Sequence, residues 1–133
     1  MKTLALILFT LTAFQAFATD LQCQGEIFRP GDRSFKTILV DLQGVQNSPE
    51  QSFFAGHHAL DLSDAKTVLI FQVWDIRAEA SGLQLKISSR QAGLPTFRAS
   101  TVTGIPQNSD IAQLSLEIPG SDLVAALNCQ ARE

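Results

Sequence analysis

Two adjacent histidines, His57 and His58, lie close to Asp61 and Asp64 and form the cluster best suited to metal binding or proton transfer. Imidazole and carboxylate groups are common metal ligands and acid–base partners. On a β-strand, however, adjacent side chains point to opposite faces, so both histidines reach one metal ion only from a loop or a bulge. The pattern favours one exposed and one half-buried histidine. The alternative is a small hydrolase or metal-dependent enzyme that uses His57 or His58 with Asp61.

Other catalytic signatures are missing from the sequence. There is no Gly-x-Ser-x-Gly nucleophile elbow and no glycine-rich phosphate loop, and the acidic residues are scattered along the chain. The sequence therefore favours a protein that is not an enzyme, and we expect no cofactor and no metal.

Three polar loops are the better candidates for function, because small rigid β domains often carry their binding residues on loops. They cover residues 29–33, 89–95 and 104–110, and the first combines Pro30 with Gly31, which is typical of a turn. The alternative is that all three are plain connectors. The side chains that we expect to contact a partner are Arg29, Asp32, Arg33, Arg90, Gln91, Gln107 and Asn108.

The two cysteines, Cys23 and Cys129, lie near opposite ends of the chain. In an exported protein such a pair is interpreted first as a disulfide. Closing so long a loop stabilises the folded state by about 4–5 kcal/mol in the chain-entropy model. The alternative is a pair of free, buried thiols.

The N-terminus has the three parts of a secretory signal: Lys2, an apolar run over 4–14, and small residues at Ala16 and Ala18. We expect cleavage after residue 18 and a single mature domain over 19–133, located in the bacterial periplasm or outside the cell. The alternative, a membrane anchor, is disfavoured because a span needs about 20 apolar residues.

The charge of the chain is modest and slightly acidic. It has 10 Lys and Arg against 13 Asp and Glu, a net charge of −3. Since no run of Lys and Arg occurs along the sequence, binding to nucleic acid or to an anionic membrane is disfavoured.

The positions of these residues depend on strands, because apolar residues alternate with polar ones and Gly, Pro, Asn, Asp and Ser clusters separate the alternating segments. The segment 67–76, which includes Trp74, is apolar at successive positions, so we expect a central strand covered on both faces and Trp74 in the core. We expect a loop over 44–50, and residues 121–127 have a helix as the alternative. Strands are predicted over 21–27, 36–42, 52–62, 67–76, 83–88, 96–103, 112–118 and 123–129.

These observations predict an all-β fold, a small antiparallel β-sandwich or closed β-barrel of roughly eight short strands. The predicted function is that of an exported, disulfide-linked, non-enzymatic binding module for a protein or envelope component, acting through loops or a sheet edge. A structural subunit of an envelope assembly is a second alternative to the binding module.

Overall fold

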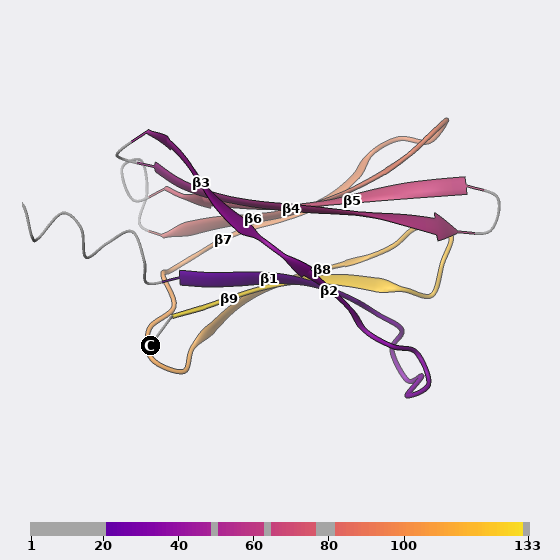
Figure 1. The fold of residues 1–133 in the computed structure, drawn as a ribbon, viewed down its shortest axis with the longest axis horizontal. Helices are drawn as coiled ribbons and strands as arrows, with labels where there is room; N and C mark the ends of the chain where they lie inside the picture. Colours follow the sequence, from indigo (N-terminus) through magenta and orange to yellow (C-terminus); the bar gives the residue numbers. More distant parts are fainter. Residues whose placement is uncertain (1–20, 49–50, 63–64, 77–81, 132–133) are drawn as a thin grey trace, which may run out of the picture.

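Two antiparallel β-sheets stacked face to face make up the structure (Figure 1), a computed structural model that describes residues 21–48, 51–62, 65–76 and 82–131. These residues form nine strands and no helix, which confirms the all-β prediction and selects the sandwich. No helix among them is long and apolar enough to cross a membrane. The predicted signal peptide, 1–18, lies outside the described residues.

The four-stranded sheet combines strands from both ends of the chain. Its order is β2 (Ile38–Asp41), β1 (Leu21–Phe28), β9 (Val124–Ala131) and β8 (Ile111–Glu117). The pairing of β1 with β9 joins the first described strand to the last one.

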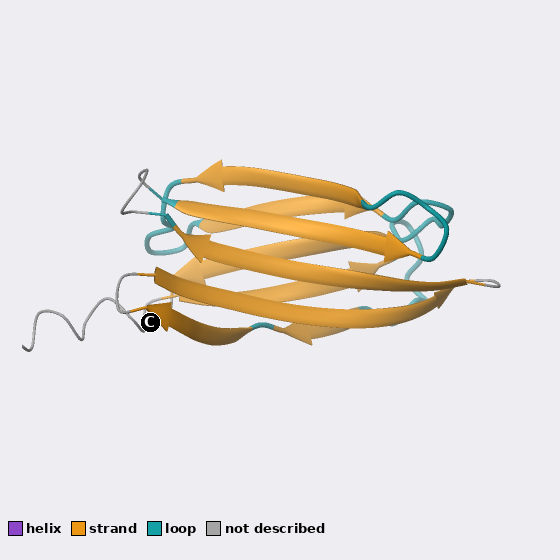
Figure 2. Ribbon diagram, turned by 90° about the horizontal axis from the view of Figure 1, so that it is seen from above, coloured by secondary structure: helices purple, strands orange, loops and turns teal. Residues whose placement is uncertain are grey.

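The five-stranded sheet is a simple meander, in which each strand pairs with the next one in the sequence. Figure 2 shows this sheet stacked over the other sheet. Its order is β3 (Gln43–Ser48), β4 (Gln51–Leu62), β5 (Ala65–Asp75), β6 (Leu83–Gln91) and β7 (Phe97–Thr103).

Two predictions about local structure are wrong, and one alternative is excluded. The expected loop over 44–50 contains most of β3, because the chain passes at Leu42 from the edge of one sheet to the edge of the other and pairs with β4. The alternative helix over 121–127 is a turn followed by β9, whose backbone pairs with β1 and β8 on its two sides. The strand β6 continues to Gln91, so the loop predicted over 89–95 begins later. In each case tertiary pairing overrides local propensity.

The core lies between the sheets and is built from every second residue of each strand. On β5 the inward side chains of Leu69, Phe71 and Val73 are fully buried, while the alternate side chains are half-buried. The prediction of a strand covered on both faces is therefore wrong, because a two-layer sandwich covers only the inner face of each sheet. For the same reason Trp74 lies on the outer face and is half-buried, not in the core.

Glycine allows the two sheets to approach closely around Phe71. A Cβ atom added at Gly25 on β1 would lie 3.1 Å from three carbon atoms of the Phe71 ring. A Cβ atom at Gly56, the ladder partner of Phe71 on β4, would lie 3.1 Å from Cγ1 of Val40. The absence of a side chain at these two positions leaves room for the ring and for the chain that passes between the sheets.

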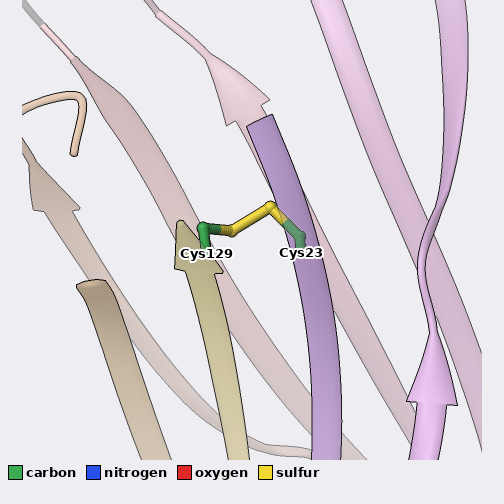
Figure 3. Close-up of a disulfide and its surroundings, with 2 residues drawn as sticks. All are labelled: Cys23 and Cys129. Atoms are coloured by element: carbon green, nitrogen blue, oxygen red, sulfur yellow. A yellow bond between two sulfur atoms is a disulfide. The ribbon is translucent and has the colours of Figure 1, made fainter. Parts of the chain in front are cut away.

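The predicted disulfide between Cys23 and Cys129 is confirmed (Figure 3). The two residues are direct partners in the ladder between β1 and β9, with Cα atoms 4.1 Å apart and a sequence separation of 106. Both side chains point into the core, where Cys23 is 5% and Cys129 0% exposed. A closed disulfide of this kind is typical of proteins that fold in an oxidising compartment.

Candidate binding surfaces

The loop between β1 and β2 is ordered by the guanidinium group of Arg29. Its Nη1 lies 3.3 Å from Oδ2 of Asp32, its Nε lies 3.0 Å from Oδ2 of Asp122, and its central carbon is 5.1 Å from the centre of the Phe35 ring. The Nε–H is not aligned with the carboxylate of Asp122, so that contact is an ion pair without hydrogen-bond geometry. Both carboxylates, Asp32 first, raise the pKa of Arg29.

The carboxylate of Asp32 also closes a tight turn within this loop. Its Oδ1 accepts hydrogen bonds from the backbone N–H of Ser34 at 2.9 Å and from the Ser34 hydroxyl at 2.5 Å. These bonds, together with the nearby Arg29, lower the pKa of Asp32. Because Arg29 and Asp32 contact each other and neighbouring groups of the protein, they shape the loop.

The same loop borders an open hollow of about 620 Å³ beside the C-terminal end of β1. The predicted binding residues Arg29, Asp32 and Arg33 all line it, together with Phe28 and Phe35. Arg33 is exposed, so its guanidinium group is accessible to a partner.

The seven predicted loop residues do not form one site. Arg90 and Gln91 lie at the end of β6, at the same end of the sandwich as the β1–β2 loop (Figure 1). Gln107 and Asn108 lie between β7 and β8 at the opposite end, beside the described C-terminus. Sequence alone could not separate these groups, because the end at which a loop lies depends on the direction of its strands.

The two histidines lie on opposite faces of β4. His57 is exposed on the outer face opposite Ile70, and His58 is half-buried on the inner face opposite Leu69. Asp61 is exposed on the same face as His57, whereas Asp64 lies outside the described residues. Within the described part of the chain, no three His, Cys, Asp or Glu side chains are placed to hold one metal ion. The two imidazoles therefore do not converge on one ligand.

The outer face of the five-stranded sheet combines cations with aromatic rings, and we call it the basic–aromatic face. Residues opposite each other in an antiparallel ladder share a face, so the register places on this side Lys66, Lys86, Arg90 and Arg98, against one described acidic residue, Asp61.

An aromatic pair lies at the end of this face away from the β1–β2 loop. The rings of Phe53 and Trp74 have centres 5.5 Å apart, and Nζ of Lys86 lies 5.9 Å from the centre of the Trp74 ring. Both rings are half-buried, and Gln72 separates Trp74 from the half-buried side chains of Ile70 and Val68 further along β5. The face therefore has two apolar patches along β5, with cations beside them.

The outer face of the four-stranded sheet has a different composition, and we call it the amide face. It presents three acidic side chains, Glu26, Asp41 and Glu117, and its described strand residues include no Lys or Arg. Five amide side chains gather in an open trough of about 340 Å³ together with Glu26 and Ile111. These amides are Gln22, Gln24, Gln113, Asn128 and Gln130.

Neither face was recognised from the sequence. The alternation that marks Gln84 and Lys86 as outward-facing was visible, but it does not show which strands lie side by side. The amide trough combines residues of β1 with residues of β8 and β9, which are far from β1 in the chain.

Comparisons with known proteins identify no relative. No protein-family model matches the chain, and neither a curated protein nor a solved structure matches it. The function must therefore be inferred from the surfaces themselves.

Proposed function

We propose that this chain is an exported, non-enzymatic binding module whose basic–aromatic face binds an acidic surface of a partner protein. The observation that carries the proposal is the separation of charge across the sandwich. The four cations of one outer face oppose a single described acidic residue, while the other outer face has three acidic residues and no described cation. The chain as a whole is slightly acidic, so this basic face is not a consequence of its average composition.

The residue types of the face suit a protein partner. Trp and Arg are enriched among the residues that dominate binding energy at protein interfaces, where apolar centres are surrounded by polar rims. Here Phe53, Trp74 and Ile70 supply half-buried apolar surface, and Arg90 and Arg98 supply exposed cations. Cations arranged on one face also accelerate association with an acidic partner.

Export is supported by the disulfide between Cys23 and Cys129 and by the signal-like N-terminal sequence. On this basis the partner belongs to the bacterial periplasm or the extracellular space.

A capture experiment with two matched variants tests the proposal. The disulfide-bonded protein is immobilised and exposed to extracytoplasmic proteins of its source, and the retained proteins are identified. One variant combines Arg90→Glu with Arg98→Glu on the face, and the control combines Arg33→Glu with Lys36→Glu in the exposed β1–β2 loop. The two variants make the same change in net charge.

We expect a retained partner whose affinity falls at least tenfold in the face variant, falls with added salt, and stays unchanged in the loop variant. A Trp74→Ala substitution should also weaken binding of the same partner. Equal retention of the partner by both charge variants would contradict its assignment to the basic–aromatic face. Loss of the partner only in the loop variant would place the binding site at the hollow beside Arg33.

One observation favours a second candidate, a structural subunit of an envelope assembly. The edge strands β7 and β8 each present a large apolar side chain to solvent, Val102 at 57% and Ile111 at 59% exposure. Unpaired edges with exposed apolar residues are potential sites of strand addition. Sedimentation velocity tests this candidate, which requires an assembly that dissociates in a Val102→Lys variant.

A further inference from the structure

We infer that the trough on the amide face is a second binding site, which takes a short neutral oligosaccharide. The trough lies on the opposite side of the sandwich from the basic–aromatic face, so this inference does not depend on the proposed protein partner. Its amides come from three adjacent strands, β1, β9 and β8, in two rows that cross the sheet. The ladder register places Gln24, Asn128 and Gln113 in one row, and Gln22, Gln130 and Ile111 in the next.

Most of the hydrogen-bonding capacity of these amides is unused. Gln24 Nε2 donates to Oδ1 of Asp41 at 3.5 Å, a long bond. Within the described residues, the other four side-chain amides have no hydrogen-bond partner in the protein. Each amide offers two donor hydrogens and one acceptor oxygen. The trough is therefore a dense set of donors and acceptors pointing away from the core.

Amide groups match the chemistry of sugars. The adjacent N–H and C=O groups of one amide can bind two neighbouring hydroxyl groups at once, one as an acceptor and the other as a donor. Ile111, 59% exposed at the side of the trough, offers an apolar surface for the C–H face of a sugar ring. A site with a few apolar contacts and several oriented polar groups is typical of small-ligand recognition.

The charge of the face selects the class of sugar. Glu26 lines the trough, Asp41 and Glu117 lie on the same face, and the described strand residues of this face include no Lys or Arg. An acidic sugar would therefore be repelled, whereas the carboxylate of Glu26 can accept hydrogen bonds from the hydroxyl groups of a neutral one.

The size and floor of the trough also fit a short oligosaccharide. From Gln22 to Glu26 it extends about 14 Å along β1, and from β1 to β8 about 10 Å across the strands, at the usual spacings of a β-sheet. Gln24 and Asn128 are half-buried at its centre, and the small side chain of Ala126, 2% exposed, lies beside them on the same face. Ala126 is covered by its neighbours, so Gln24 and Asn128 form the bottom of the trough.

Nuclear magnetic resonance with the ¹⁵N-labelled protein tests the inference directly. The probes are chitotriose, cellotetraose and maltotetraose as neutral oligosaccharides, and a galacturonic acid oligomer as the acidic comparison. The readout is the set of side-chain NH₂ resonances of Gln113, Asn128 and Gln130. Non-specific contact with an exposed surface would not shift these three resonances selectively. A Gln113→Ala, Asn128→Ala variant is compared with a Gln72→Ala, Gln84→Ala control on the opposite face.

We expect at least one neutral probe to shift the resonances of the trough amides. The trough variant should bind that probe at least about tenfold more weakly, because it lacks two amides that would form hydrogen bonds with the sugar. The control variant should bind as the unchanged protein does. Three outcomes would overturn the inference: no shift with any neutral probe at millimolar concentration, equal weakening in the control variant, or equally tight binding of the acidic oligomer. None of them bears on the capture experiment, because that concerns the other face.

Discussion

The two sheets of this sandwich differ in how the chain builds them and in what they present to solvent. The five-stranded sheet is a meander of sequence neighbours whose outer face is basic and aromatic. The four-stranded sheet joins the two ends of the chain, and its outer face is rich in amides and acidic groups. Local hairpins build the first, whereas the second forms only when β1 meets β9. The comparison indicates that two outer faces of different chemistry can share one core although the sheets that support them depend on chain closure to different degrees.

The strongest test of this difference is removal of the disulfide. A Cys23→Ala, Cys129→Ala variant should lose about 4 kcal/mol of unfolding free energy, because the unfolded chain regains the freedom of a very long loop. Urea denaturation measures the loss. Hydrogen exchange should show a larger increase in exchange rate for the backbone amides of β1 and β9 than for those of β4 and β5, because β4 and β5 pair locally. Equal loss of protection in both sheets would remove the distinction between them.

The close contact between the sheets is tested at Gly25. A Gly25→Val substitution should cost about 1–3 kcal/mol, because the new side chain would overlap the Phe71 ring on the facing sheet. Thermal and urea unfolding measure the cost. In a Phe71→Leu background the same substitution should cost less, and this coupling is the evidence for direct contact. Independent, additive effects would contradict the packing.

A stabilising change is expected in the five-stranded sheet at Thr67. Its side chain is 1% exposed, and its Oγ1 has no hydrogen-bond partner among the described residues. A Thr67→Val substitution replaces this buried hydroxyl with a methyl group and should raise the unfolding free energy by about 1 kcal/mol. The control is Thr101→Val on β7, where the Thr101 side chain is half-buried, and it should change the unfolding free energy little. A loss of stability at Thr67 would indicate that the hydroxyl is satisfied.

The smallest effect concerns the loop beside the four-stranded sheet. The pKa of Asp32 is lower in the folded protein than in the unfolded chain, so its ionised form stabilises the fold above a pH of about 4, and this contribution is lost as the pH falls below that value. An Asp32→Asn variant should therefore be slightly less stable than the unchanged protein at neutral pH and equally stable near pH 2. Urea unfolding at both pH values measures the difference, and a difference that grows in acid would contradict the assignment.

The alternation of residues was sufficient to predict most strands and the direction of many side chains. Leu83, Leu85 and Ile87 alternate with polar residues, and all three are buried. Cys23 and Cys129 belong to alternating segments at the two ends of the chain, and the predicted disulfide joins them. These predictions succeed because a strand directs successive side chains to opposite faces whatever its neighbours are.

Only the tertiary structure decided which strands lie side by side and which faces remain uncovered. Trp74 belongs to an apolar segment that resembles a buried central strand, yet it lies outside because no third layer covers that face. The segment of β3 has turn-forming residues, yet it is a strand because β4 offers it backbone partners. The amide trough likewise combines side chains of β1 with those of β8 and β9, which are distant from β1 in the sequence. Alternation within one strand is a local property, whereas the pairing of strands and the stacking of sheets depend on hydrogen bonds and burial between distant parts of the chain.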